Sequence, residues 1–301
     1  READLLELRV LKYFLMTARE ENITRAATLL HITQPTLSRQ LMQLEDELGV
    51  KLFSRSNHNI RLTQDGMLLR RRAQEIISLA EKTEQELSCS KTELSGEVSI
   101  GCGETRNMDF LSEQIAAFRE KYPRVRFMIY TANADDIKER IEKGLLDMGL
   151  MMEPVDISRY EFVRMPLKEQ WATMVKEDSP LAKKEFVTPR DLIGIPIIHV
   201  YRRSVKETVA DWFGSLYENI EIAATYNLVR NAVNMVKNCV GAAICYVLED
   251  HYEGVKTIPL YPALEAGAVL AWKKEQPTSA AAAGFVEEVK KCVSGIPDNS
   301  I

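Results

Sequence analysis

Apolar residues in the first 30 positions recur at the spacing of two short helices. The first helix is marked by side chains that would share one face: Leu5, Leu8, Leu11, Phe14, Leu15 and Ala18. It should end near Arg19. Asn22 can cap a second helix over residues 23–30, where the paired Ala26 and Ala27 allow another helix to approach closely. The pattern therefore predicts two tightly packed helices.

A third helix is predicted from its N-cap Thr33 to Gly49, with Pro35 in the first turn. Its buried stripe consists of Leu37, Leu41, Leu44 and Leu48. The opposite face carries side chains that can hydrogen-bond to base edges: Gln34, Thr36, Ser38, Arg39, Gln40 and Gln43. Glutamine can pair with adenine and arginine with guanine, whereas the acidic residues 45–47 lie at the far end. An ordinary solvated face would show the same polarity, so this helix alone leaves both interpretations open.

Residues 50–53 and 60–62 then predict two short strands around a polar turn, which together would form a wing. Arg55 and Arg61 at its edges would lie along phosphates, and His58 and Asn59 at its tip would approach a minor groove. The three helices and the wing predict a winged helix-turn-helix that binds double-stranded DNA.

A long helix is predicted to follow, capped by Thr63 and running past residue 87. Its apolar positions are spaced as in a coiled-coil heptad: Leu69, Ala73, Ile76, Ala80, Thr83 and Leu87. The helix could pack on its own domain. However, no other nearby apolar segment could cover its apolar positions, so a partner helix is the favoured interpretation. Residues 91–96 have the composition of a hinge.

Short apolar runs alternate with amphipathic helices from Glu97 onward, which predicts an α/β architecture. A first set has strands over 98–102, 125–130 and 147–152 and helices over 109–122 and 135–143. A second set has strands over 171–175, 195–200, 222–226 and 242–246 and helices over 205–217 and 228–238. A strand over 266–272 and a helix over 279–293 should return to the first set, with crossovers near Arg164 and Glu265.

The distribution of charge removes an objection to DNA binding. The formal net charge is −5, yet residues 1–95 are neutral, with 14 basic and 14 acidic residues. Within residues 22–72 the basic residues outnumber the acidic ones, because Arg25, Arg39, Lys51, Arg55, Arg61, Arg70, Arg71 and Arg72 face only four carboxylates. Such a local basic footprint is what phosphates attract.

Composition and segment lengths predict a globular protein of the cytoplasm. Hydrophobic residues make up 46% and charged residues 28% of the chain, and the longest apolar run, 240–248, is far too short to span a bilayer. The first four residues do not resemble a signal peptide, so no membrane partner is expected. The five cysteines lack a CxxC pair, and no cofactor or metal is expected.

Five segments together resemble the LysR-type transcriptional regulator family. They are Ile23-Thr24-Arg25-Ala26-Ala27, the run from Thr33 to Leu41, Leu44-Glu45, the run from Leu48 to Arg55, and the run from Leu62 to Gly66. One position departs from the family pattern, because His58 stands where many relatives carry arginine, which puts a full phosphate contact in doubt there.

The resemblance implies a homodimer or tetramer on a pseudo-palindromic operator, with RNA polymerase as a further candidate partner. Thr24, Arg25 and Thr33 join the candidate DNA contacts. The expected organisation is a winged helix-turn-helix over 1–65, a dimerising linker over 66–95, and a two-lobed effector domain like the periplasmic binding proteins. Lobe I would comprise 96–164 and 265–301, and lobe II 165–264.

The effector is expected between the lobes, outside the carboxyl ends of strands. The candidate contacts are Gly103, Thr105, Thr131, Met152, Tyr201, Arg202, Ser204, Asn227 and Tyr246. Thr105 and Ser204 rank first because a hydroxyl can bind a carboxylate oxygen, and Arg202 adds positive charge. These residues favour an organic anion.

Three other classes of function compete with a DNA-binding regulator that responds to a small molecule. An enzyme is disfavoured because the chain has no GxSxG, GxGxxG, Walker A or HExxH motif, and its four histidines are scattered. A plain solute-binding protein would have no use for residues 1–95. A thiol-based redox regulator, for instance through Cys239 and Cys245, stays open.

Overall fold

The computed structural model describes residues 6–55, 60–88, 94–248, 252–274 and 279–295. The chain divides into two compact units, Arg1–Ser88 and Cys89–Ile301, and each is described by itself.

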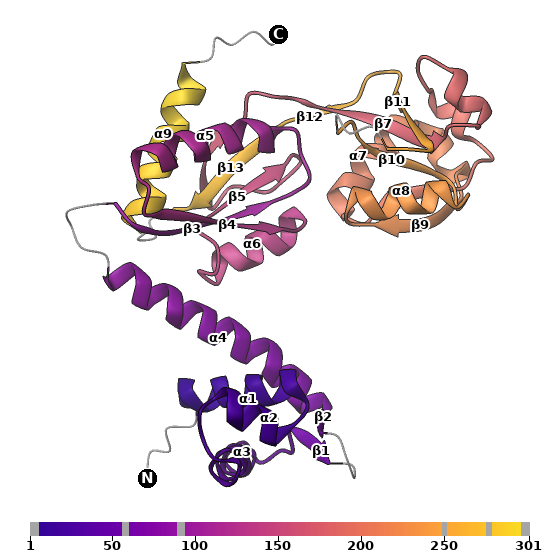
Figure 1. Ribbon diagram of the computed structural model, residues 1–301. Helices are drawn as coiled ribbons and strands as arrows, with labels where there is room; N and C mark the ends of the chain where they lie inside the picture. The colour runs from indigo at the N-terminus through magenta and orange to yellow at the C-terminus, as the bar shows by residue number, and fades with distance from the viewer. Residues whose placement is uncertain (1–5, 56–59, 89–93, 249–251, 275–278, 296–301) are drawn as a thin grey trace. The chain divides into compact units, whose positions relative to one another are not determined.

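The first unit contains three short helices, a two-stranded wing and one long helix (Figure 1). Their bounds are α1 Leu8–Glu20, α2 Ile23–Leu29, α3 Gln34–Leu48, β1 Phe53–Arg55, β2 Ile60–Leu62 and α4 Gln64–Ser88. The predicted caps are confirmed, because the Asn22 side chain accepts a hydrogen bond from the Arg25 amide and Thr33 accepts one from the Thr36 amide. Gly49 ends α3 with a left-handed φ of 69°.

The prediction of a strand over 50–53 was wrong, since β1 begins only at Phe53. The reason is a long-range contact that periodicity does not reveal. The Glu45 carboxylate accepts hydrogen bonds from the amides of Leu52 (2.8 Å) and Phe53 (3.1 Å). These amides are therefore tied to the end of α3, and pairing with β2 starts one residue later than Leu52.

Lobe I of the second unit is a five-stranded sheet in the order β4-β3-β5-β13-β6. Its strands are β3 Gly96–Cys102, β4 Val125–Thr131, β5 Met148–Met152, β6 Tyr160–Arg164 and β13 Ala268–Lys273. Strands β4, β3 and β5 are parallel, and β13 is antiparallel to β5 and β6. Helices α5 Asn107–Lys121 and α9 Ala280–Ser294 pack on one face, and α6 Ala134–Glu142 packs on the other (Figure 1).

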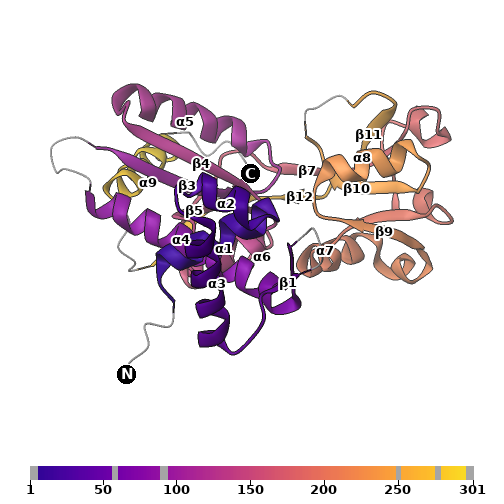
Figure 2. The same cartoon turned by 60° about the horizontal axis from the view of Figure 1, so that its bottom comes forward.

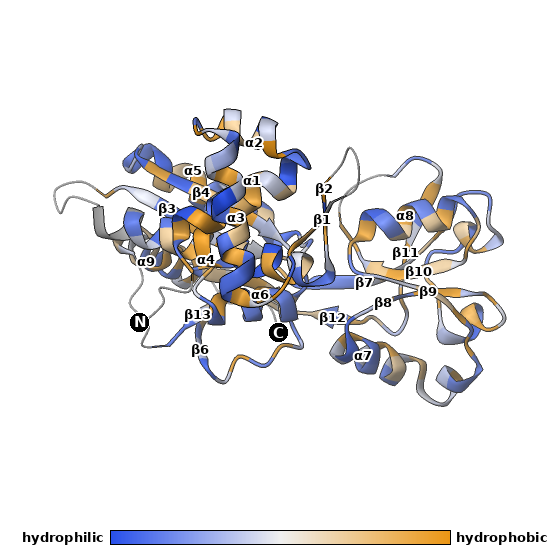
Figure 3. Ribbon diagram, turned by 90° about the horizontal axis from the view of Figure 1, so that it is seen from below, coloured by the Kyte–Doolittle hydropathy of each residue, from blue (hydrophilic) through white to orange (hydrophobic). Residues whose placement is uncertain are grey.

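Lobe II is a six-stranded sheet in the order β11-β7-β10-β8-β9, with β12 paired to β7. Its strands are β7 Glu169–Lys176, β8 Ile197–Val200, β9 Ile222–Tyr226, β10 Ala242–Tyr246, β11 Val255–Pro259 and β12 Glu265–Ala266. Helices α7 Arg203–Phe213 and α8 Val229–Lys237 cover opposite faces. Both are amphipathic, and in Figure 3 each alternates hydrophobic and hydrophilic residues along its length.

Two chain segments connect the lobes, β7 on the way out and β12 on the way back, and Figure 2 shows them side by side. β6 ends at Arg164, and β12 pairs with β7 through Glu265 and Gln170. Strands β6 and β11 were not predicted from the sequence. No described helix is long and apolar enough to cross a membrane.

Candidate DNA-binding and effector sites

The outward face of α3 carries the predicted base-reading side chains. Gln34, Pro35, Thr36 and Arg39 are exposed, while Leu37, Leu41 and Leu44 are buried in the core on the other side. Among the described residues, the guanidinium of Arg39 forms no hydrogen bond or ion pair, so it can reach a ligand without breaking a contact. Thr33 and Thr36 instead bond each other through their hydroxyls at 2.8 Å.

Two predicted contacts farther along α3 lie beside carboxylates. Gln40 and Gln43 line a groove with Glu7 and Glu47, and the Gln43 amide donates to Glu47 at 2.8 Å. Arg25 on α2 is likewise engaged, since it pairs with Glu20 at 2.5 Å. Gln43 and Arg25 would have to exchange a protein partner for DNA, which Arg39 would not.

The wing presents Arg61 as an exposed side chain on β2. Arg55 ends β1, and its backbone pairs with Ile60. His58, the departure from the family pattern, lies outside the described residues.

Glu45 fixes the position of the wing relative to α3, a role that the sequence analysis missed. Its carboxylate is buried and accepts a third hydrogen bond from the Lys51 ammonium at 2.8 Å. Burial alone would raise the pKa of Glu45, but the hydrogen bonds from Lys51, Leu52 and Phe53 together lower it. The ionised form is therefore the one that the fold stabilises.

Gly66, in the first turn of α4, allows this helix to approach the wing. A Cβ atom at this position would overlap the carbonyl oxygen of Leu52. The Thr63 hydroxyl accepts from the Gly66 amide at 3.0 Å and donates to the Lys51 carbonyl at 2.6 Å. The start of α4 is thus packed directly against the residues that Glu45 holds.

The predicted heptad seam of α4 is partly covered by the unit's own core, which corrects the assumption that nothing else could cover it. Ala73 is fully buried and Leu69 is half-buried in the core that contains α1. Ile76 and Thr83 are exposed, Ala80 is half-buried, and the side chain of Leu87 is outside the described set. The apolar face that stays open is instead Leu68, Ile76 and Leu79, exposed by 53%, 39% and 42%.

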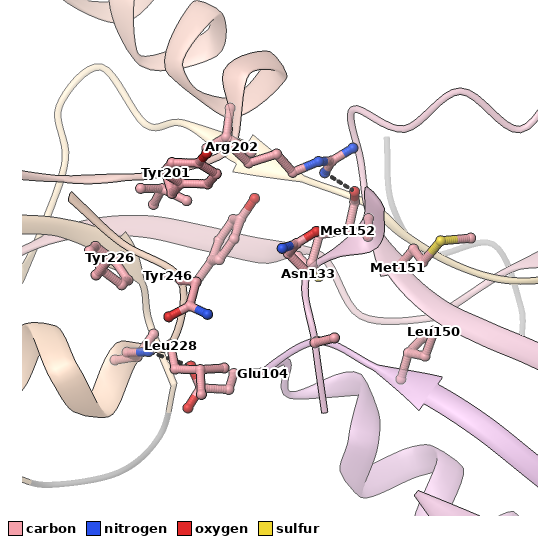
Figure 4. A pocket seen from close by; sticks show the side chains of 17 residues that line it. Glu104, Asn133, Leu150, Met151, Met152, Tyr201, Arg202, Tyr226, Leu228 and Tyr246 are labelled. Atoms are coloured by element: carbon pink, nitrogen blue, oxygen red, sulfur yellow. Dashed lines mark hydrogen bonds between the residues drawn. The ribbon is translucent and has the colours of Figure 1, made fainter. Parts of the chain in front are cut away.

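A small cavity of about 90 Å³ lies between the two lobes of the second unit (Figure 4). Six of the nine predicted effector contacts line it: Gly103, Met152, Tyr201, Arg202, Asn227 and Tyr246. Thr105 and Thr131 line a neighbouring cavity of about 470 Å³, and Ser204 lines neither. The ranking of Ser204 among the first candidates is therefore not supported by its position.

Arg202 bridges the lobes. Its guanidinium donates to the carbonyl oxygens of Met152 (3.3 Å) and Pro154 (2.7 Å), and its Nε lies 3.5 Å from the Asp135 carboxylate. The side chain is only 9% exposed. Its two terminal nitrogens are therefore engaged by lobe I, whereas its buried Nε has no hydrogen-bond partner among the described residues.

Glu104 makes the reciprocal bridge from lobe I to lobe II. Its carboxylate accepts a hydrogen bond from the amide of Val229, the first residue of α8. The amino end of a helix attracts negative charge, and here the chain supplies its own carboxylate. The sequence does not reveal this contact, because the two residues lie 125 positions apart.

Thr105 is not available as predicted, because its hydroxyl donates to the fully buried carboxylate of Glu169. The Asn107 side chain donates to the same Oε1 atom at 3.0 Å. Oε2 of Glu169 and the Tyr246 hydroxyl are both buried, and neither has a hydrogen-bond partner within the described part of the chain.

The described cysteines do not favour a thiol switch. Burial raises the pKa of Cys102 to about 12, with Glu169 contributing, and burial raises that of Cys245 to about 12. Cys239 is exposed and Cys292 is half-buried, and neither is in a disulfide. A nucleophilic thiolate at Cys245 is therefore disfavoured at neutral pH.

The first unit presents an exposed polar helix face with an arginine beside a wing, and the second is a two-lobed α/β unit. This combination defines the class of DNA-binding regulators with an effector domain. Comparison with family models gives the family. Residues 8–67 match the bacterial regulatory helix-turn-helix protein model of the lysR family, and residues 91–292 match the LysR substrate binding domain. The chain belongs to the LysR-type transcriptional regulators and is not an enzyme.

Individual relatives align over most of this chain. It is 30% identical to the Hca operon transcriptional activator HcaR of Escherichia coli over 262 residues, which cover 85% of this chain and 82% of HcaR. It is 27% identical to the HTH-type transcriptional regulator YvbU of Bacillus subtilis, over 93% of this chain and 97% of that protein. The fold is similar to that of CbnR complexed with its target DNA, with a TM-score of 0.72 and 21% identity over 95% of this chain and 99% of CbnR.

Proposed function

We propose that this regulator binds a pseudo-palindromic operator as a homodimer, and that a small molecule held between the lobes alters that binding. The observation that carries the DNA-binding half is Arg39, which is exposed on the face of α3 opposite the core and whose side chain has no partner among the described residues. A bidentate arginine on a recognition helix is suited to read guanine in the major groove. Arg61 and Arg55 on the wing would contact phosphates.

The dimer would form through the open face of α4. Leu68, Ile76 and Leu79 are large apolar side chains that one copy leaves exposed, and they follow each other at helical spacing. A second copy of α4 could cover them in a symmetric contact, which would set the distance between the two recognition helices.

The effector half rests on the position of the cavity. Both lobes line it, and Arg202 and Glu104 cross it in opposite directions. A ligand that enters must change these two bridges, so binding there would alter the relation of the lobes. Regulation requires a difference in ligand affinity between two arrangements, which such bridges can provide.

Operator binding by the full chain tests the proposal. The DNA between this gene and a divergently transcribed neighbour serves as the probe, titrated at several salt concentrations by fluorescence anisotropy. Arg39→Ala should weaken binding by about 1–3 kcal/mol, or roughly 5- to 150-fold, for the operator far more than for random DNA. Arg61→Ala should weaken both and reduce the salt slope by about 1.

Arg19→Ala is the matched control, because Arg19 is an exposed arginine of the same unit that pairs with Glu20 on α1. It should leave operator affinity unchanged. Equal losses for the Arg19 and Arg39 variants, with the fold retained, would show that α3 contributes only general positive charge.

A further inference from the structure

Two residues that line the interlobe cavity each bring a buried polar atom without a hydrogen-bond partner. The atoms are Nε of Arg202 and the hydroxyl oxygen of Tyr246, and neither finds a partner in the part of the chain that the structure describes. Both residues belong to lobe II, and Figure 4 shows the Tyr246 hydroxyl on the side of its ring that faces Arg202. Buried polar groups normally have partners, so this pair marks a place where a ligand atom would be held.

The chemistry of the pair specifies that ligand atom. The Nε–H group of an arginine can only donate a hydrogen bond. Burial raises the pKa of Tyr246 above its ordinary value, Arg202 lowers it and Glu169 raises it, so the phenol keeps its proton at neutral pH and can also donate. Two donors on one side of a cavity are satisfied by an acceptor oxygen, whose two lone pairs can take both bonds.

The other contacts of Arg202 leave this position open. Its two terminal nitrogens donate to the carbonyl oxygens of Met152 (3.3 Å) and Pro154 (2.7 Å). The Asp135 carboxylate lies 3.5 Å from Nε but forms no hydrogen bond with it, and the Asp135 side chain is 65% exposed. Because water screens such an exposed carboxylate, Asp135 replaces neither the missing hydrogen bond nor a direct partner for the buried charge.

Other buried polar groups nearby do not alter the kind of ligand atom that fits. Oε2 of Glu169 and Nε1 of Trp171 also have no hydrogen-bond partner among the described residues, but neither residue lines this cavity. Of the two charged neighbours that shift the pKa of Tyr246, Arg202 acts more strongly than Glu169. The surroundings of the hydroxyl therefore favour a ligand atom that carries negative partial or full charge.

Glu104 lies at the other end of the cavity. Its carboxylate accepts a hydrogen bond from the Val229 amide, and Figure 4 shows the ring of Tyr246 between Arg202 and Glu104. An oxygen bound at Arg202 would therefore be separated from this carboxylate by the tyrosine ring.

The rest of the wall is mainly apolar and encloses little space. The volume of about 90 Å³ is smaller than the roughly 150 Å³ cavity that encloses benzene, so the enclosed part of the ligand is small. The aliphatic side chains that line it are Leu150, Met151, Val205 and Leu228.

We propose that the interlobe cavity binds a small ligand by an acceptor oxygen, which Nε of Arg202 and the hydroxyl of Tyr246 hold together, with the apolar body of the ligand against Leu150 and Val205. Carboxylates and amides of small hydrocarbons have this chemistry, and the carboxylate binds more tightly because hydrogen bonds between charged partners are stronger.

The same side chain links the ligand to the contact between the lobes. The terminal nitrogens of Arg202 hold lobe I, so a ligand oxygen on Nε completes the set of partners of a residue that bridges the two lobes. This inference rests on the proposed function of the cleft. It moves the recognised oxygen from Thr105 and Ser204, which the sequence ranks first, to Arg202 and Tyr246.

Matched sets of three ligands test the kind of atom that is recognised. Isovalerate, isovaleramide and isobutylamine share one apolar body, as do phenylacetate, phenylacetamide and benzylamine. Binding to the full chain without DNA is measured by calorimetry and by the shift in melting temperature. At least one carboxylate should bind saturably, with at least tenfold higher affinity than its matched amine, which corresponds to about 1.4 kcal/mol. The amide should also bind more tightly than the amine, because its carbonyl oxygen is an acceptor.

Two variants assign the recognition to residues. Tyr246→Phe removes only a hydroxyl that has no partner within the described chain, so the melting temperature of the free protein should not fall, while carboxylate affinity should fall about fivefold. Arg202→Lys keeps the charge but not the planar set of nitrogens, so it should lower both carboxylate affinity, at least tenfold, and the melting temperature. Tyr217→Phe is the matched control, because it removes a hydroxyl from a tyrosine of the same lobe that lines neither cavity.

The outcomes separate this inference from the proposed function. An amine that binds as tightly as its carboxylate, a failure of both carboxylates and amides to bind, or equal losses in Tyr246→Phe and Tyr217→Phe would each overturn the acceptor assignment. An amide that binds as tightly as its carboxylate would support it and would show that the hydrogen bonds, rather than the charge, are recognised. Operator binding is measured without ligand, so its loss alone would overturn the proposed function and leave the ligand assignment standing.

Discussion

Replacing Glu45 with alanine should loosen the wing from the recognition helix. The amide of Leu52 donates to the Glu45 carboxylate at 2.8 Å, and Leu52 is only 1% exposed. A buried amide that loses its acceptor costs about 1–3 kcal/mol, and the half-buried amide of Phe53 adds to this. The pair with Lys51 adds little, because Lys51 is 68% exposed. The expected loss is therefore about 2–4 kcal/mol.

Hydrogen exchange of the α3 amides in the full chain measures this loss within one unit. A destabilisation of about 2–4 kcal/mol predicts roughly 30- to 1,000-fold faster exchange, if opening of the unit limits protection. Operator affinity should fall with it, since Arg55 and Arg61 lie on the strands that Glu45 anchors. Glu45→Gln, which retains an oxygen acceptor, should lose less.

Asp46→Ala is the matched control, because it removes the same charge from the adjacent residue. Asp46 is 78% exposed and lies 4.0 Å from the same lysine. Its removal should change stability by less than about 0.5 kcal/mol. Equal effects of the two substitutions would show that charge, and not the buried hydrogen bonds, matters at this corner.

The pH dependence gives an independent check. The folded pKa of Glu45 lies below its ordinary value of 4.5, so its stabilisation is fully present above that pH and is lost as the pH falls through the folded pKa. Between pH 7 and 5 the wild type and Glu45→Gln should differ by a constant amount. Below pH 4.5 the difference should shrink, and a difference that grows on acidification would contradict the assigned direction.

Three further predictions concern the rest of the chain. Gly66→Ala would ordinarily gain up to about 1 kcal/mol of helix propensity. The overlap of its Cβ with the Leu52 carbonyl should instead make the variant less stable in thermal unfolding, by about 1–3 kcal/mol. The control Gln74→Ala, on the exposed side of α4, should be neutral or stabilising. Ile76→Glu combined with Leu79→Glu should shift sedimentation toward the monomer without unfolding α4, and Ala73→Glu should unfold the unit instead, since Ala73 is fully buried. In native protein at pH 7.5, Cys239 should react with iodoacetamide while Cys102 and Cys245 stay unmodified, and rapid labelling of Cys245 would reopen the thiol alternative.

Local signals predicted the first unit well. Asn22, Thr33 and Gly49 act on residues within one helical turn, so their effect can be read from the sequence beside them. The start of β1 could not be predicted in the same way, because it depends on Glu45, a residue seven positions before Leu52 that belongs to another element.

Strand β6 was missed for a different reason. It runs mostly along the surface, with Glu161, Phe162 and Arg164 exposed, so it shows no clear apolar alternation. The burial of part of the α4 heptad in its own unit could not be predicted from spacing either. Its spacing was real, but periodicity does not say whether Ala73 meets α1 of its own chain or α4 of another.

The cleft shows the limit most clearly, because there contacts with distant residues decide what each charged side chain can do. Arg202 was expected to bind an anion, yet two of its nitrogens donate to carbonyl oxygens that precede it by 48 and 50 positions in the chain, and its Nε lies 3.5 Å from the carboxylate of Asp135. The Glu104 carboxylate accepts a hydrogen bond from the amide at the start of α8, 125 positions later in the chain. The sequence shows the residue types of the cleft but not these pairings, so what each charge contributes to ligand recognition depends on contacts that only the fold defines.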